Sequence, residues 1–253
     1  SSKETLKKTP FKKERASSDI VRLLSGEWDF KYYKSNKYLP DEIDTDAVDF
    51  DKIKVPSTWQ RIGYDSPAYI NCPYPFDDAP PYVPNEQPVA IHRKLFDVQA
   101  NGKKFILSFL GVIPCIDLYI NGKFVGYSEG AHNTAEFDIS DFVVDGENEL
   151  FAVIHKWSNA TFLECQDMFR ENGIFRDVLL YTYEKTYIND FQAIAKKSGK
   201  KYNLEIEAEL KGALENAKIK AELYDGEKLL AEETIDGAEK NAITFKALAV
   251  EEW

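Results

Sequence analysis

The stretch IDLYINGKFVGY, residues 116–127, decides the fold class of this 253-residue chain. Ile116, Leu118 and Ile120 alternate with other residues before Asn121-Gly122, and the run 123–127 returns on its other side; this dipeptide supplies positive φ at both central positions of a type I′ turn. Alternation with period two is typical of a strand with one buried face. The pattern therefore predicts a β-hairpin over residues 116–127.

Similar short segments, separated by turns about ten residues apart, lie on both sides of this hairpin. We expect further strands at residues 28–32, 91–97, 105–110, 134–138, 149–155 and 177–183. The proline-rich stretch 77–88 is expected to be a shaped loop, because proline has no N–H to donate to a strand ladder. Many short strands at this spacing favour a sandwich or jelly roll.

The composition changes after about residue 184, where Lys, Glu and Ala become more frequent and aromatic residues fewer. Alternating runs at 202–210 and 217–223, with Asp225-Gly226 after them, predict a second all-β unit. It spans only residues 184–253, whereas a seven-strand sandwich usually needs about 100 residues. We therefore expect the chain to end inside this domain, with an unpaired edge and an open apolar face.

The net charge is −11 and the isoelectric point is about 4.9, which argues against nucleic acid or an anionic membrane as a partner. Residues 1–19 are locally basic, and we expect them to form an extended arm. The three cysteines, Cys72, Cys115 and Cys165, are odd in number and lack CxxC spacing, so they fit neither a disulfide framework nor a zinc site. Together with the lack of a signal-peptide pattern, this predicts a cytoplasmic protein.

Several motifs in residues 20–183 occur together and in a fixed order. They are VPSTWQRIGYDSPAYIN (55–71), PYPFDDAPPYVP (73–84), INGKFVGYSEG (120–130), EFDISDF (136–142), GENEL (146–150) and QDMFRENGIFRDV (166–178). This set resembles glycoside hydrolase family 2, and within it the large β-galactosidases of the lac-operon type. The resemblance covers essentially the whole first unit.

The resemblance implies an all-β fold with two domains behind the arm. Residues 20–183 would form a galactose-binding-like jelly-roll β-sandwich, the sugar-binding domain, and residues 184–253 an incomplete immunoglobulin-like β-sandwich. In the family a (β/α)₈ barrel follows and carries the chemistry. Nothing in this chain resembles that barrel.

The activity that the resemblance implies is hydrolysis of terminal β-D-galactosides, such as lactose, with retention. Retaining glycosidases use two carboxyl groups about 5–5.5 Å apart. The chain has 43 acidic residues, but none lies in a recognisable catalytic motif of the family. We therefore name no catalytic residue and expect the chain alone to be inactive, as part of a larger β-galactosidase.

Two positions of the resemblance imply a contribution to the sugar pocket. Asn71 matches a family asparagine that reaches the pocket, and Asp167 matches an aspartate that binds an active-site sodium and a galactose hydroxyl. Cys72 stands where the lac-type enzymes have a valine. The family's active-site magnesium ligands would lie in the barrel, so the chain is expected to hold part of a sodium site and no complete cofactor site. Glu129 and Asn159 match only part of a peripheral magnesium site.

Structural roles compete with these assignments. Without the resemblance, Asp167 would be read as a turn cap or an ion-pair partner, and Asn71 beside a proline suits a turn. Trp59, Tyr74 and Tyr82 are candidates for a sugar-stacking platform or, more simply, for packing. The three histidines lie far apart and are expected to be structural.

The segment 161–178 mixes the chain's only methionine and three phenylalanines with six charged residues. We expect its apolar residues to hold it against the sandwich while Asp167 projects towards a site completed elsewhere. Arg170 and Arg176 would fix the loop through bonds to carboxylates or carbonyls. Gly173 would permit the turn into a strand at residues 174–181.

Three other functions remain open from the sequence. The jelly roll could be a stand-alone carbohydrate-binding module, which would need a row of exposed aromatic residues. The parent protein could have a different family 2 activity, such as that of a β-glucuronidase. The arm and sheet edges could serve assembly, with the full enzyme a homo-oligomer.

Overall fold

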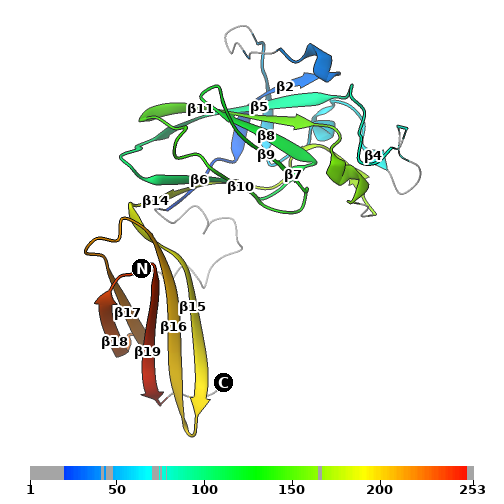
Figure 1. The fold of residues 1–253 in the computed structure, drawn as a ribbon. Helices are drawn as coiled ribbons and strands as arrows, with labels where there is room; N and C mark the ends of the chain where they lie inside the picture. Colours follow the sequence, from blue (N-terminus) through cyan, green and yellow to red (C-terminus); the bar gives the residue numbers. More distant parts are fainter. Residues whose placement is uncertain are drawn as a thin grey trace. The chain divides into compact units, whose positions relative to one another are not determined.

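The computed structural model describes residues 20–40, 43, 48–69, 74, 76–77, 79–164 and 167–249. The chain divides into two compact units, of which the first ends at Thr182 and the second begins at Tyr183. Strands dominate both units, so the prediction of an all-β fold is confirmed (Figure 1). No helix among the described residues is long and apolar enough to cross a membrane.

Unit 1 consists of short antiparallel strands. The described strands are β1 Val21–Leu23, β2 Gly26–Tyr33, β3 Asp51–Val55, β4 Ala68–Tyr69, β5 Val89–Val98, β6 Lys104–Phe109, β7 Val112–Ile113, β8 Cys115–Ile120, β9 Lys123–Glu129, β10 Ala135–Asp138, β11 Gly146–His155, β12 Phe169–Arg170, β13 Gly173–Ile174 and β14 Val178–Tyr183. Three 3₁₀ helices accompany them: η1 Asn36–Tyr38, η2 Trp59–Ile62 and η3 Asn159–Phe162. The predicted hairpin is confirmed, because β8 and β9 pair across the turn with Ile120 opposite Lys123.

Two sheets of unit 1 lie face to face, as expected for a jelly roll (Figure 1). One has six strands in the order β3-β2-β5-β11-β8-β9, and the other has four in the order β1-β14-β6-β10. Two short ribbons, β4 with β12 and β7 with β13, lie outside these sheets. All of these pairs are antiparallel, which fits the alternation of buried and exposed residues along the strands.

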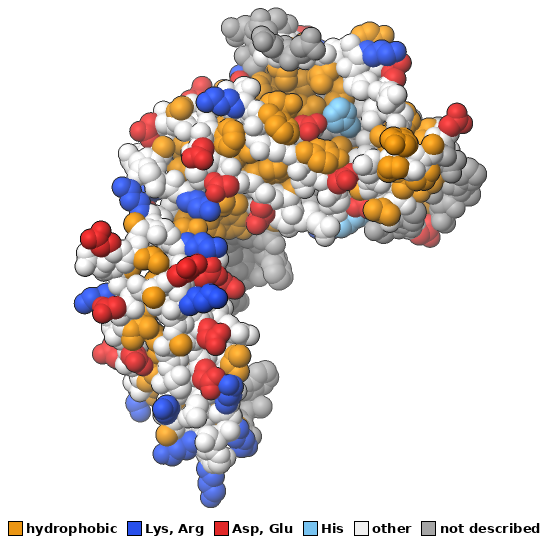
Figure 2. All heavy atoms as spheres, in the orientation of Figure 1, with side chains coloured by type: hydrophobic (Ala, Val, Ile, Leu, Met, Phe, Trp, Pro, Cys, Tyr) orange, Lys and Arg blue, Asp and Glu red, His pale blue; other side chains and the backbone are white. Residues whose placement is uncertain are grey.

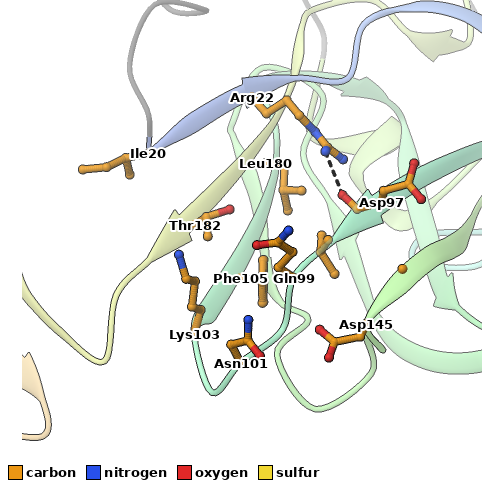
Figure 3. Close-up of a pocket in the computed structure, with 12 residues that line it drawn as sticks. Ile20, Arg22, Asp97, Gln99, Asn101, Lys103, Phe105, Asp145, Leu180 and Thr182 are labelled. Atoms are coloured by element: carbon orange, nitrogen blue, oxygen red, sulfur yellow. Dashed lines mark hydrogen bonds between the residues drawn. The ribbon is translucent and has the colours of Figure 1, made fainter.

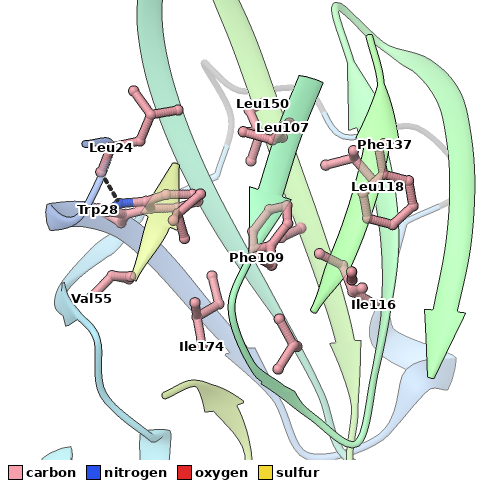
Figure 4. Close-up of a cluster of buried hydrophobic side chains, with 14 of the residues drawn as sticks. Leu24, Trp28, Val55, Leu107, Phe109, Ile116, Leu118, Phe137, Leu150 and Ile174 are labelled. Atoms are coloured by element: carbon pink, nitrogen blue, oxygen red, sulfur yellow. Dashed lines mark hydrogen bonds between the residues drawn. The ribbon is translucent and has the colours of Figure 1, made fainter. Parts of the chain in front are cut away.

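The core of unit 1 fills the space between the two sheets. Figure 4 shows Trp28, Phe109, Leu118 and other side chains of this cluster, each at most a few per cent exposed. The indole of Trp28 donates a hydrogen bond of 2.9 Å to the Leu24 carbonyl, so its polar atom is satisfied inside the core. Each large apolar side chain buried in this way contributes about 1.5–3 kcal/mol.

Unit 2 has two smaller sheets. Its strands are β15 Thr186–Ser198, β16 Lys201–Gly212, β17 Lys218–Asp225, β18 Lys228–Asp236 and β19 Lys240–Leu248. The first sheet has the order β15-β16-β19 and the second is the hairpin of β17 and β18. The hairpin signal at Asp225-Gly226 is confirmed, with the turn itself formed by Gly226 and Glu227. On the face in view in Figure 2, lysine, arginine and acidic side chains are interspersed over this unit, as expected for strands with one face in water.

Strand β15 has apolar residues that unit 2 leaves exposed. Ile188 and Phe191 lie opposite Leu210 and Ala208 of β16, which belong to the core of this unit, yet their exposed fractions are 53% and 67%. An apolar cleft of about 210 Å³ runs beside them and is bounded on its other side by β17 residues such as Ile219. The open apolar face expected from the sequence is therefore present on β15.

Candidate functional site

The segment 161–178 leaves η3, passes through the ribbon strand β12 and enters β13 before joining β14. Of the two residues predicted to contact a sugar, Asp167 is described and Asn71 lies outside the described residues, as does Cys72. The candidate site is therefore built from Asp167 and the strands around it.

Asp167 is exposed two residues before β12, and its Oδ1 accepts a hydrogen bond from the hydroxyl of Tyr69. Tyr69 is the last residue of β4, which is the partner strand of β12 in the ribbon. The two residues are 98 positions apart in the sequence, so the contact exists only because the ribbon forms. The carboxylate is thus presented at an accessible edge.

The β4–β12 ribbon has one exposed side, which is aromatic, and one buried side. Tyr69 lies opposite Phe169, with ring centroids 5.7 Å apart, and both rings are about half exposed or more, at 47% and 63%. Ala68 lies opposite Arg170, whose side chain is only 6% exposed. Because neighbouring residues of a strand point to opposite faces, burial of Arg170 turns Phe169 outward.

Polar contacts to η2 hold the segment just after Asp167. Glu171 Oε2 accepts hydrogen bonds from the Thr58 hydroxyl at 2.7 Å and from Arg61 Nε at 3.0 Å. Asn172 and Gln60 form a reciprocal pair, in which Gln60 Nε2 donates to Asn172 Oδ1 at 2.8 Å and the Asn172 N–H donates to Gln60 Oε1 at 2.9 Å. These hydrogen bonds therefore join residues 171–172 to residues 58–61 through both side chains and backbone.

Gly173 adopts a conformation that only glycine adopts readily, with φ of +133°. A Cβ at this position would lie 2.9 Å from the Ser57 carbonyl oxygen and 3.1 Å from Thr58 Cα. The close approach allows the Ser57 N–H to donate to the Ile174 carbonyl at 2.8 Å. The turn expected at Gly173 is not found there, because Gly173 begins strand β13; its requirement for glycine comes from φ and from the close contact with the 57–58 backbone.

Arg176 fixes the end of the segment. Its Nη1 donates to the carbonyls of Leu110 and His132, at 3.3 and 3.2 Å, and its guanidinium lies 5.0 Å from the centroid of the Phe175 ring. The expectation that Arg176 binds carbonyls is confirmed. Phe162, at the other end, packs edge to face against Tyr74 with centroids 5.1 Å apart. Apolar and charged residues of the segment thus have separate structural partners.

A groove of about 680 Å³ is lined by Met168 and Phe169, the two residues after Asp167, but Asp167 is not among its lining residues. Its walls come from η2 with the residues before it and from the segment itself, and they combine apolar and polar side chains. The lining residues are Pro56, Ser57, Thr58, Arg61, Ile113, Met168, Phe169, Glu171 and Phe175. Such a mixed surface, with Phe169 exposed at its edge, suits a ligand that has both a hydrophobic face and hydroxyl groups.

A larger hollow, of about 860 Å³, lies elsewhere in unit 1 and contains none of the predicted site residues. Arg22, Gln99 and Lys103 line it over an apolar floor that includes Phe105 (Figure 3). The Arg22 guanidinium donates to the Asp97 carbonyl at 2.7 Å, so this charge already has a partner in the wall. Its size alone does not make it the candidate site.

The aromatic residues considered for a stacking platform are not brought together as one. Trp59 is fully buried and packs against Tyr32, with centroids 5.9 Å apart. Tyr74 stacks on Phe76, with centroids 5.6 Å apart, whereas Tyr82 is 76% exposed in the proline-rich loop. Trp59 and Tyr74 therefore pack, as the simpler interpretation expected.

The histidines have structural surroundings. His92 is fully buried in the core, His132 contacts the Phe175 ring with centroids 5.6 Å apart, and His155 Nε2 lies 3.3 Å from an Asp117 oxygen. Their separation agrees with the expectation of structural roles.

The described residues do not form a complete metal site. Glu129 Oε2, considered for magnesium, accepts hydrogen bonds from the Tyr127 hydroxyl at 2.9 Å and from the Ala160 N–H at 3.2 Å. Within the part of the chain that the structure describes, no three His, Cys, Asp or Glu side chains are grouped for a metal ion. Asp167 could supply a single carboxylate ligand, which is a suitable hard donor for an alkali cation.

Sequence reasoning missed the partner of Asp167. Tyr69 lies in the motif 55–71, but a two-residue strand has no periodicity that would reveal its pairing. The sequence identifies Phe169 only as one of several apolar residues in a segment that is also rich in charge, and not as an exposed one.

Comparison with known proteins decides the family. The family model described as "Glycosyl hydrolases family 2, sugar binding domain" matches residues 21–184. The chain belongs to glycoside hydrolase family 2. The resemblance drawn from the sequence motifs is thereby confirmed.

Three similar curated proteins are each named "Beta-galactosidase". A "Beta-galactosidase" of Actinobacillus pleuropneumoniae is 43% identical over 178 residues, which are 70% of this chain and 18% of that protein. One of Alteromonas mediterranea is 35% identical over 239 residues, which cover 88% of this chain and 22% of that protein. The chain thus spans about a fifth of the length of these family 2 relatives.

Solved structures of similar fold are more distant in sequence. The β-glucuronidase of Ruminococcus gnavus superposes with a TM-score of 0.66 at 19% identity, over 92% of this chain and 38% of that one. That of Bifidobacterium dentium gives a TM-score of 0.60 at 17% identity, over 91% and 43% of the two chains. At this identity the likeness shows the fold, which agrees with a family 2 sugar-binding region followed by a second β unit.

Proposed function

We propose that this family 2 chain is the amino-terminal part of a β-galactosidase that hydrolyses terminal β-D-galactosides with retention. The observation that carries the proposal is the 43% identity over 178 residues to a β-galactosidase, whereas the β-glucuronidase structures share only 17–19%. The substrate would be a lactose-like β-galactoside.

Asp167 and Asn71 would contribute to the galactose subsite. The exposure of Asp167, and the presence of the next residue, Met168, in the wall of a groove with polar and apolar sides, support this role for it. A carboxylate accepts hydrogen bonds from sugar hydroxyls and also suits sodium, so Asp167 would be one ligand of a shared sodium site. The remaining sodium ligands, the magnesium ligands and the catalytic carboxylates would come from a (β/α)₈ domain of the whole enzyme.

The boundaries proposed for the domains are residues 1–19 for the arm, 20–183 for the jelly roll and 184–253 for an immunoglobulin-like sandwich. The whole enzyme would act in the cytoplasm as a homo-oligomer. The acidic composition supports the expectation that neither nucleic acid nor a membrane is a partner.

Steady-state kinetics of the full-length protein test this proposal. We expect hydrolysis of a chromogenic β-galactoside with a kcat/KM at least 100-fold above that for the matching β-glucuronide, and no activity of the 253-residue chain by itself. A preference for the glucuronide, or turnover by the purified chain free of host enzyme, would contradict it.

A stand-alone carbohydrate-binding role is a second candidate, favoured by aromatic residues on the β8–β9 hairpin. Phe124 and Tyr127 are 53% and 50% exposed, and Phe124 packs against Tyr119 with centroids 5.3 Å apart. Calorimetry of the 253-residue chain with galactosides would detect such binding below a few millimolar. Loss of that binding on Phe124→Ala would favour this second role.

A further inference from the structure

We propose that the larger hollow of unit 1 binds a small anion that also carries hydroxyl groups, with Arg22 holding the anionic group. The hollow, of about 860 Å³, is walled by β1, β5, β6 and β14 and by the connection at residues 99–103. It shares no lining residue with the groove described above. The proposal uses neither Asp167 nor Asn71, so it goes beyond the proposed function and does not depend on it.

Arg22 is oriented for a further ligand. Its Nη1 donates to the Asp97 carbonyl at 2.7 Å, and its guanidinium lies 6.0 Å from the centroid of the Phe96 ring. Both contacts are with uncharged groups, and no carboxylate of the described residues forms an ion pair with Arg22. An arginine has five N–H donors in a planar fork. Nε and Nη2 therefore remain to donate the two parallel bonds that a carboxylate or phosphate accepts.

The charges around the hollow favour an anion at the Arg22 end. Arg22 and Lys103 contribute two positive charges to the lining, and Asp97 and Asp145 contribute two negative ones. In Figure 3 the Asp97 carboxylate points away from Gln99 and the rest of the hollow. The carboxylate on the inner surface is therefore that of Asp145.

The rest of the lining suits a body that is partly apolar and partly polar. Val98, Phe105 and Leu180 are at most 8% exposed and form the apolar floor. Gln99 and Thr182 belong to the walls, and within the described part of the chain neither the amide nor the hydroxyl has a hydrogen-bond partner. A volume of this order, with a few polar groups over an apolar floor, is typical of small-molecule sites.

Asp145 supplies an acceptor for hydroxyl groups. Its Oδ1 accepts a hydrogen bond of 2.6 Å from the Ala100 N–H, which fixes the orientation of the carboxylate. An ionised carboxylate has about four acceptor positions, so others remain for a ligand. Gln99 and Phe105 lie between Arg22 and Asp145 in Figure 3. A ligand with an anionic group at one end and hydroxyl groups at the other matches this arrangement, as a sugar phosphate or a sugar acid does.

Calorimetry of the 253-residue chain with glucose 6-phosphate, glucuronate and glucose tests the proposal. The first two ligands distinguish a phosphate from a carboxylate on the same ring, and glucose has neither. Arg22→Gln removes the guanidinium fork, and Gln99→Leu removes the amide from an exposed side chain of similar size. Lys123→Gln removes one positive charge at the exposed start of β9 and is the control for net charge. Thermal melting followed by circular dichroism checks that each variant folds.

We expect at least one of the two anions to bind with a Kd below about 1 mM, and at least about tenfold tighter than glucose. Arg22→Gln should weaken this binding by at least about tenfold and Gln99→Leu by about threefold or more, whereas Lys123→Gln should change it by less than about twofold. Binding of glucose 6-phosphate alone would assign the site to phosphates, and binding of glucuronate alone would assign it to carboxylates.

Three results would overturn the proposal: no binding of either anion up to about 10 mM, glucose binding as tightly as the anions, or wild-type affinity in Arg22→Gln. Should Arg22→Gln fail to fold, Gln99→Leu decides in its place, and unchanged affinity in that variant is the adverse result. Hydrolysis of β-galactosides by the full-length protein is measured separately, so failure of one proposal leaves the other standing.

Discussion

His92 makes the stability of unit 1 depend on pH. The side chain is fully buried beside Phe30, with ring centroids 5.0 Å apart, and among the described residues neither ring nitrogen has a hydrogen-bond partner. Burial lowers the pKa of His92 from 6.5 to about 3. The unfolded chain exposes the same imidazole to water, so it takes up the proton first as pH falls.

The magnitude follows from these two pKa values. Stability is unaffected well above pH 6.5, falls by about 1.4 kcal/mol per pH unit below it, and stops falling once the pH has passed the folded value near 3. Between pH 7.5 and 5.0 the loss from His92 is therefore about 2 kcal/mol. His92→Leu has a similar volume and no titration, so we expect it to lose about 2 kcal/mol less than wild type over this interval.

Urea unfolding at pH 7.5, 6.5, 5.5 and 5.0 measures this effect, followed by tryptophan fluorescence. Three of the four tryptophans, Trp28, Trp59 and Trp157, lie in unit 1 and report on its unfolding. Carboxylates titrate equally in both proteins, so the difference between wild type and His92→Leu isolates the imidazole. A difference that did not change with pH would refute the argument that a neutral histidine is held in the core.

Three further changes have defined outcomes. Gly173→Ala should destabilise unit 1 by about 2–4 kcal/mol in urea unfolding, because φ is +133° and the new Cβ would lie 2.9 Å from a backbone oxygen. The control Gly146→Ala, with φ of +90° and open space around the new Cβ, should cost about 1 kcal/mol, and equal losses in the two variants would contradict this reasoning. Cys115 is buried, and burial raises its pKa to about 12. Peptide mapping should therefore find Cys115 unmodified by iodoacetamide at pH 8 until urea is added, and rapid labelling of the native protein would count against this. Arg93→Met removes the partner of Asp29 at 2.8 Å and of Glu149 at 2.6 Å, and should cost about 1–2 kcal/mol in thermal or urea unfolding, with no loss being the adverse result.

The parts of the fold that sequence could predict are those encoded locally. Asn121-Gly122 fixes the β8–β9 turn by backbone conformation, and the alternation before it assigns Ile116, Leu118 and Ile120 to the buried face. Strand β15 was missed, because a register shift between Ile188 and Asp190 interrupts the alternation of its apolar residues. A period of two is informative only where the strand is regular.

The candidate site was predictable only in part, for a related reason. Asp167 could be singled out because its motif resembles a known family, but its contact with Tyr69 joins segments 98 positions apart through a pair of two-residue strands. Trp59 was a candidate for a sugar platform, with packing the simpler interpretation, and its complete burial shows that it packs. Non-local pairing, which leaves no periodic trace, determines the geometry of the site.

We propose that the Asp167 carboxylate belongs to a galactose subsite completed by the rest of the enzyme. Its most direct test is kcat/KM of the full-length protein with a β-galactoside, compared between wild type, Asp167→Asn and the control Asp141→Asn, which changes another exposed aspartate of unit 1. We predict a loss of about 100-fold for Asp167→Asn, the upper range for hydrogen bonds to a charged group, and less than twofold for the control. A kcat/KM for Asp167→Asn within threefold of wild type would contradict the claim.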